Sequence, residues 1–152
     1  MAKFFRRGVS KVYFMTADPG ASVSSSEFTA GVDLSPFISE MSGWQLTNTP
    51  IRTPNLADTF TSQIDGEETV GDSTLTMNDE NGASDFRDAL PKGTEGFIVL
   101  APYGIAAGKR CEVWPVKSTG INDQYTVANE PARTVVSFAI TAVPVQTAVT
   151  AA

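Results

Sequence analysis

The sequence predicts a mainly β fold: a β-sandwich or small barrel of about six to eight strands, with one short α-helix and a long arm between two strands. Gly, Thr, Val and Ser exceed helix-forming residues in most windows. Several short segments alternate polar and apolar residues, and Gly, Pro, Asn and Asp separate them. With 152 residues, 41% of them hydrophobic, the chain is expected to form a single domain over residues 1–152.

The first half of the chain predicts three strands. Residues 9–15 (VSKVYFM) predict the first, and the Pro-Gly pair and serine run of residues 18–27 predict a loop after it. Residues 28–34 predict a short second strand. Residues 37–46 (FISEMSGWQL) predict a third, in which Gly43 indicates a bulge that switches the faces of the strand midway.

The second half predicts four more strands and the helix. Residues 74–78 alternate, so Leu75 and Met77 are expected to point inward. Residues 84–90 predict the helix, since Ser84 suits an N-cap and Pro91 ends the pattern. The remaining strands are expected at residues 96–101, which should be buried centrally, at residues 110–117, where Pro115 indicates an edge or a bulge, and at residues 133–143. Residues 144–152 are expected to fray. The predicted core includes Leu75, Phe86, Phe97, Val99 and Phe138.

Residues 47–72 form a connection between two expected strands that is several times longer than a hairpin needs. Apolar residues recur among its polar ones, which a solvated linker would not require. We therefore expect an extended arm that packs on a neighbouring molecule. Its predicted apolar anchors are Ile51, Leu56, Phe60, Ile64 and Val70.

Several chemistries are excluded or disfavoured. The absence of histidine removes Ser-His-Asp and Cys-His catalysis and the Cys/His zinc sites. Residues 104–110 differ from a phosphate-binding loop in spacing and lack its Ser or Thr, so they predict a hairpin turn. Residues 78–81 lack EF-hand spacing, and residues 65–68 predict a solvated Asp-Gly turn rather than a catalytic pair. We expect no enzyme, no cofactor and no metal site.

The net charge and the cysteine content limit which partners and which cellular compartment are expected. A net charge of −6 disfavours binding to nucleic acid, and the basic residues of the N-terminus, which include Arg6 and Arg7, predict a solvated arm. The lone Cys111 is expected inside a strand and is compatible with a reducing cytosol. No apolar window suits a membrane span or a signal peptide, so synthesis in the cytoplasm is expected.

The order of these elements resembles the major tail tube protein of long-tailed bacteriophages. The resemblance rests on the strand FISEMSGWQL, the long polar arm, the strand GDSTLTMND, the segment ASDFRDALPKGTEG and the strands FIVLAPYG, KRCEVWPVKSTGI and TVVSFAITAV. It implies a structural virion protein of the phage tail that forms hexameric rings. The rings would stack into a hollow tube through which DNA passes without specific binding, and partners would include the tape measure, terminator and distal tail proteins.

Two points from the residues themselves bear on this resemblance. A sheet face made of polar side chains is expected to contact water, and the wall of a pore would provide that contact. The candidate lumen residues are Gln45, Thr74, Thr76 and Asn78. Two alternatives remain open: a tail terminator or head-tail connector that closes as a single ring, and a monomeric carbohydrate- or surface-binding sandwich that uses Trp44, Trp114 and Tyr103 as a stacking platform.

Overall fold

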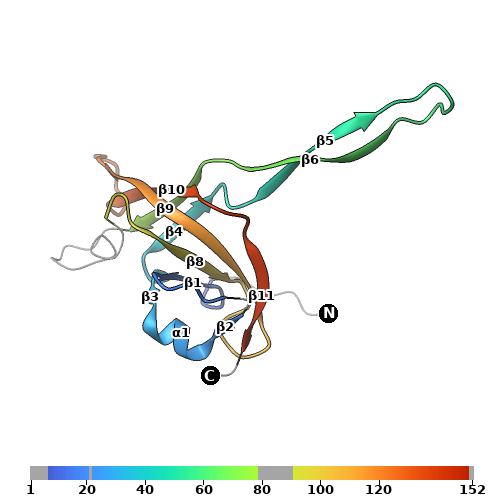
Figure 1. Ribbon diagram of the computed structural model, residues 1–152. Helices are drawn as coiled ribbons and strands as arrows, with labels where there is room; N and C mark the ends of the chain where they lie inside the picture. Colours follow the sequence, from blue (N-terminus) through green and yellow to red (C-terminus); the bar gives the residue numbers. More distant parts are fainter. Residues whose placement is uncertain (1–6, 21, 79–90, 151–152) are drawn as a thin grey trace.

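A computed structural model describes residues 7–20, 22–78 and 91–150 (Figure 1). Within these ranges the chain is mainly β, as predicted, with more strands than expected and one short helix. The elements are β1 (Lys11–Met15), β2 (Val23–Ser24), α1 (Ser25–Ala30), β3 (Val32–Asp33), β4 (Ile38–Ser42), β5 (Leu46–Thr53), β6 (Ser62–Val70), β7 (Ser73–Asn78), β8 (Glu95–Ala101), β9 (Arg110–Gln124), β10 (Arg133–Ile140) and β11 (Val145–Thr150).

Nine strands form one sheet and the remaining two form a separate ribbon. The main path through the sheet is β3-β1-β8-β9-β10-β7-β4, and β11 pairs with both β9 and β2. Its pairings are antiparallel apart from the short parallel contact of β11 with β2. The two strands expected on either side of the arm do pair, because β4 lies antiparallel to β7. The single strand predicted over residues 37–46 was wrong, because β4 ends at Ser42 and Leu46 begins β5 of the ribbon. The ribbon consists of β5 and β6.

The 15-residue strand β9 is the spine of the sheet. It pairs with β8 along one edge, and with β11 and then β10 along the other. Pro115 was expected to mark an edge or a bulge, but it lies inside the sheet. The missing N–H of Pro115 costs no hydrogen bond between strands there, because Pro115 falls between the last paired residue with β11 and the first with β10. Its carbonyl accepts a hydrogen bond from the amide of Thr141 at 3.0 Å.

Two hydrophobic clusters cover the two faces of the sheet. The larger packs on one face and includes Phe14, Leu75, Trp114, Val136 and Phe138. The smaller lies between the other face and the layer of α1, β2 and β11 (Figure 1). Since that layer covers only β1, β8 and part of β9, the same face of β7 and β10 is left without an apolar cover.

The only helix among the described residues is α1, where a loop and a strand were predicted. Ser24 caps it by accepting from the amide of Glu27 at 3.4 Å. Phe28 is buried and packs edge-on against Tyr13, with ring centroids 5.0 Å apart. The serine run therefore starts a helix of only six residues, too short to show helical periodicity. The predicted helix at residues 84–90 lies outside the described residues.

The C-terminal prediction was wrong. Residues 145–150 form β11 instead of fraying, because their small β-branched and polar side chains suit a strand. Gln146 lies opposite Glu112 of β9, and Val149 lies opposite Val23 of β2. The strand thus closes the smaller core.

Most of the predicted core is confirmed. Leu75 and Val99 are fully buried and Phe138 is nearly so. Phe97 is partly buried against the smaller cluster, and Phe86 lies outside the described residues. Burial alternates along β7 as predicted, with Leu75 and Met77 inward, and residues 96–101 fall in the central strand β8.

Substitution of Val149 tests the role of β11. Val149 is 2% exposed and Val145, in the same strand, is 43% exposed. Val149→Ala should lower the free energy of unfolding by about 2 kcal/mol, whereas Val145→Ala should change it by less than about 0.5 kcal/mol. Chemical denaturation measures both. Equal, small effects would show that β11 does not close the core.

Candidate assembly surface

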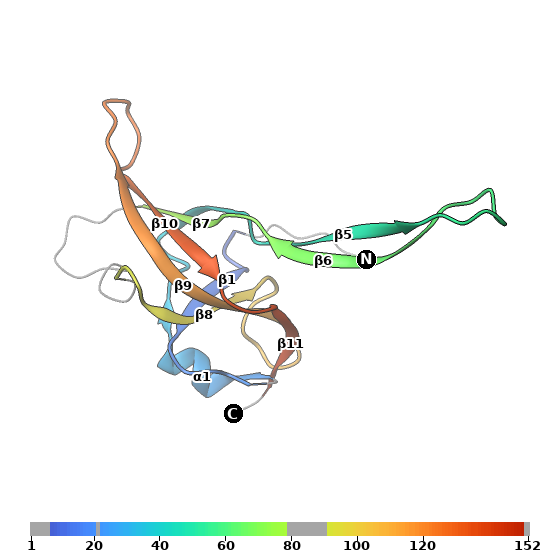
Figure 2. The ribbon, with the colours of Figure 1, turned by 45° about the horizontal axis from the view of Figure 1, so that its top comes forward.

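The predicted arm, residues 47–72, is a two-stranded antiparallel ribbon that projects from the body (Figures 1 and 2). Its strands pair from Leu46 opposite Val70 out to Thr53 opposite Ser62. The turn between them is held locally. The side-chain oxygen of Asn55 accepts from the amides of Ala57 at 2.9 Å and Asp58 at 3.0 Å.

A bulge interrupts the ribbon midway. The register shifts between Thr49 and Ile51, and Gly66 lies on the facing strand. A Cβ at Gly66 would collide with the Thr49 carbonyl, so the two backbones approach too closely for any larger residue. The side-chain oxygen of Asn48 accepts from the Gly66 amide at 3.3 Å. The Asp-Gly pair at residues 65–66 was predicted as a turn, and it forms this bulge instead.

Four of the five predicted anchors are exposed on the ribbon. Ile51 and Ile64 lie opposite each other and are each more than half exposed. Leu56 is fully exposed and Phe60 is 78% exposed, both in the turn. Val70 differs, because it is half-buried against the larger core at the base of the ribbon. The arm therefore carries an apolar surface along its length and at its tip.

The arm is also the most acidic segment of the described chain. Residues 47–72 contain five carboxylates against the single cation Arg52, a net charge of −4. The carboxylates are Asp58, Asp65, Glu67, Glu68 and Asp72, all exposed. Exposed side chains of one sign repel one another, so the approach of a basic surface lowers the electrostatic free energy of the arm.

Three residues fix the arm to the body. Gly43 has φ +80°, a conformation that disfavours any side chain, and a Cβ there would collide with the Asp72 carbonyl. The buried hydroxyl of Ser73 donates to the Gly43 carbonyl at 3.0 Å. The indole of Trp44 packs edge-on against Trp114 at 5.5 Å and donates to the carbonyl of Thr74 at 3.0 Å. The bulge predicted at Gly43 was wrong, because the register of β4 shifts between Ile38 and Glu40 and Gly43 lies in the connection between β4 and β5, from which the arm departs.

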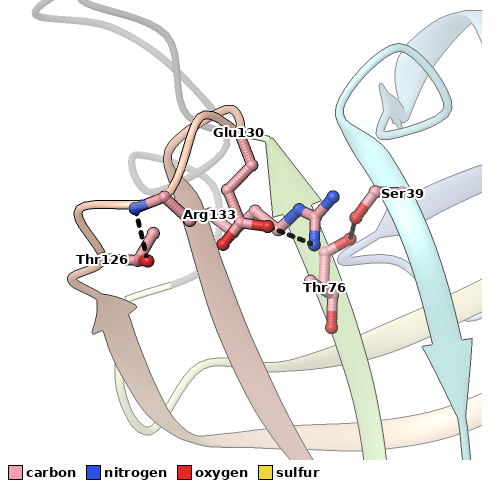
Figure 3. Close-up of polar contacts among 6 residues, drawn as sticks. Ser39, Thr76, Thr126, Glu130 and Arg133 are labelled. Carbon is pink, nitrogen blue, oxygen red and sulfur yellow. Dashed lines mark hydrogen bonds and ion pairs between the residues drawn. The ribbon is translucent and has the colours of Figure 1, made fainter.

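Three candidate lumen residues share one sheet face. Thr74, Thr76 and Asn78 alternate with buried residues along β7. Glu40 of β4 lies opposite Thr76, and Arg133 of β10 lies opposite Asn78. Figure 3 shows this end of the face, where Ser39 donates to the Thr76 carbonyl at 3.2 Å and Arg133 lies 4.0 Å from Glu130. The described part of this face is thus polar with charges of both signs.

Gln45 lies apart from these three. It lines a hollow of about 400 Å³ beside the arm base, together with Trp44, Glu112 and Gln146. The structure therefore brings Thr74, Thr76 and Asn78 together and leaves Gln45 at a different place.

The titratable side chains of the described residues do not adopt the arrangement that a metal site needs. No group of three or more His, Cys, Asp or Glu side chains is placed to hold a metal within them. Burial, followed by the adjacent carboxylate of Glu112, raises the pKa of the buried Cys111 thiol, which disfavours the nucleophilic thiolate. In the same part of the chain, no helix has the length and apolar character to cross a membrane.

A second projecting hairpin was not predicted from the sequence. The turn between β9 and β10 stands away from the body (Figure 2), and it exposes Tyr125 and Val127 almost completely. An ion pair between Glu130 and Arg133 and a hydrogen bond from the Ala128 amide to Thr126 Oγ1 shape this turn. Two isolated apolar residues in a polar stretch were the only sequence signal.

The described residues form a β body from which an apolar-tipped ribbon projects. The chain belongs to the phage tail tube protein family, whose sequence profile matches residues 1–152. It is therefore a structural protein of the phage tail. A comparison with curated proteins gave no match.

Solved structures of contractile injection systems share the fold. The sheath/tube terminator of the extracellular system PVC superposes with a TM-score of 0.67 at 11% identity, covering 96% of this chain and 98% of that chain. The sheath-tube complex of PVC gives 0.61 at 13% identity, with 92% and 88% covered. The tube terminating cap of the anti-feeding prophage gives 0.62 at 10% identity, with 97% and 94% covered.

Gly43 and Gly71 offer a matched test of the arm base. Gly43→Ala should lower the free energy of unfolding by at least about 2 kcal/mol, because the substitution meets both a positive φ and the Asp72 carbonyl. Gly71→Ala should have an effect near zero, because no atom lies within 4 Å of its added methyl. Denaturation midpoints measure both. Equal midpoints would show that the backbone at Gly43 is not constrained at the base of the arm.

Proposed function

We propose that this protein is the subunit of a tail tube, in which hexameric rings stack into a hollow tube that lets DNA pass. The observation that carries the proposal is the ribbon β5–β6, which leaves Leu56 and Phe60 exposed at its tip. Burying a large apolar side chain is worth about 1.5 to 3 kcal/mol, and no layer of the described residues packs on the ribbon to supply this gain. A neighbouring subunit can supply it.

The polar face of β7 and β10 supports a role at the channel. Thr74, Thr76 and Asn78 keep this face wet, and the chain as a whole is negative. Because Glu130 lies 4.0 Å from Arg133 and offsets its charge, such a wall releases few counterions from DNA, so the DNA is not held. We infer that this face lines the lumen and that DNA passes without specific binding.

The same surfaces also fit a narrower alternative. A tail terminator or head-tail connector would use the same body but close as one ring, because its arm would meet a different protein instead of a further copy. The family match favours the tube. The carbohydrate-binding alternative is disfavoured, because Trp114 is only 3% exposed and the Trp44 indole N–H is already bonded inside the subunit.

Further partners follow from the proposed tube. Its ends require other tail proteins, which we infer to be tape measure, terminator and distal tail proteins. The subunit would be made in the host cytoplasm and then assembled into the virion tail. We assign it no catalytic role and no cofactor.

Shortening the arm tests the proposal. Replacing residues 49–67 by Asn-Gly keeps the base pairs Leu46–Val70 and Asn48–Glu68 and closes them with a two-residue turn. The variant should fold with a stability within about 1 kcal/mol of the natural chain, because it loses no core contact. It should form no tubes by negative-stain microscopy, with or without tail initiation components.

A matched control separates the apolar tip from the arm as a whole. Leu56→Ser with Phe60→Ser should weaken assembly without changing the denaturation midpoint, because both side chains are exposed in the free subunit. Tubes that form normally from the shortened variant would contradict the proposed role of the arm. A natural chain that stays monomeric at high concentration would contradict the tube itself.

Lysines at Thr74 and Thr76 test the assignment of the lumen. Tubes of the double variant should still assemble, bind double-stranded DNA in a salt-dependent way and slow its ejection. Natural tubes should bind DNA negligibly at the same ionic strength. Normal ejection with no gain in DNA affinity would mean that this face of β7 points away from the channel.

A further inference from the structure

The polar face of the sheet carries a lysine as well as Arg133. Residues directly opposite each other on neighbouring antiparallel strands point to the same face. Ser137 of β10 lies opposite Thr74, so Ala139, two residues further along β10, lies on the polar face too. Lys117 of β9 is opposite Ala139, and Glu95 of β8 is opposite Lys117. A row of opposite charges thus crosses this face.

Lys117 is directed to solvent on this face. It is exposed, whereas Trp114 and Val116, which point to the other face of β9, belong to the larger core. In the tube proposed above, the Lys117 ammonium group would therefore stand in the channel wall. An ammonium group that neutralises a phosphate releases counterions and holds the DNA. A lysine without a counter-charge at this place would oppose the passage of DNA.

Glu95 supplies the opposite charge. The Cβ atoms of directly opposite residues lie about 4.5 to 5.5 Å apart. This separation is shorter than the Debye length, which is about 10 Å at 0.1 M salt. The exposed carboxylate therefore lowers the electrostatic potential around the Lys117 ammonium group. The carboxylate of Glu130 is engaged elsewhere on this face, 4.0 Å from Arg133 (Figure 3).

The backbone holds Glu95 at a fixed place. Hydrogen bonding between β8 and β9 continues before Glu95, because the Ser118 amide donates to the Thr94 carbonyl at 2.9 Å. After Glu95, β1 packs closely on β8, and a Cβ at Gly96 would collide with the Met15 carbonyl. The carboxylate is thus carried by a paired strand with a set register.

We propose that Glu95 is the counter-charge that keeps Lys117 from holding DNA in the channel. This inference rests on the proposed function and names a residue that keeps the DNA mobile. A phosphate that approaches Lys117 must also approach the Glu95 carboxylate, so the contact is close to neutral. Without that carboxylate, each Lys117 that meets a phosphate adds about 0.9 to the slope of log affinity against log salt concentration. Every copy in a tube repeats the pair, so the effect accumulates along the DNA.

Removal of the carboxylate in assembled tubes tests the proposal. Tubes of Glu95→Gln should retain at least about ten times more duplex DNA than natural tubes at low salt, and they should release it as salt is raised. Glu95→Ser should behave in the same way. Glu95→Gln with Lys117→Gln should return retention to the natural level, because the cation is then gone. Retention is measured by sedimenting tubes with a short fluorescent duplex after nuclease has digested the DNA outside them.

A matched control separates the pair from the net charge of the face. Glu40 is exposed on the same face and lies opposite Thr76 instead of a cation. Glu40→Gln removes the same charge and should leave DNA retention unchanged. Equal retention by Glu40→Gln and Glu95→Gln tubes would show that only the net charge matters, and it would overturn the inference. Loss of tubes in both Glu95 variants, seen by negative-stain microscopy, would assign Glu95 to assembly and overturn it as well.

The outcomes also separate this inference from the proposed function. If tubes of Thr74→Lys with Thr76→Lys retain DNA and Glu95→Gln tubes do not, the face lines the channel and this inference fails alone. Retention by Glu95→Gln tubes that persists after Lys117→Gln is added would contradict the pairing. If neither the lysine variant nor Glu95→Gln retains DNA, the proposed lumen and this inference fail together.

Discussion

A two-stranded ribbon cannot bury its own side chains, and this constraint governs how the protein is built. The strands β5 and β6 satisfy each other's backbone groups, but they leave Ile51, Ile64, Leu56 and Phe60 exposed. Isolated hairpins are marginally stable in water, so the ribbon needs support. Among the residues that the structure describes, that support comes from its base, where Trp44 and Val70 reach the larger core.

The body is organised to hold that base rigidly. The spine β9 is paired along both edges, and its Trp114 meets the Trp44 ring at the foot of the arm. Gly43 supplies the positive φ that redirects the chain, and the Ser73 hydroxyl bonds to its carbonyl. Packing and hydrogen bonding thus fix the direction of the arm, while its tip keeps an adhesive surface for another molecule.

The sequence predicted what local patterns encode. Alternation placed Leu75 and Met77 inward, and the unusual length of residues 47–72 identified the arm. Features that depend on distant pairing were missed. Nothing local shows that residues 145–150 find β9 and β2, or that Pro115 falls between two partner strands.

We propose that the arm gains its packing partner only on assembly. Hydrogen exchange of the backbone amides of residues 46–70, compared between free subunits and purified tubes, tests it most directly. We expect slow exchange along the ribbon in tubes and fast exchange in free subunits, while the amides of β8 and β9 stay protected in both. Equally fast exchange of the ribbon in tubes and in free subunits would contradict it.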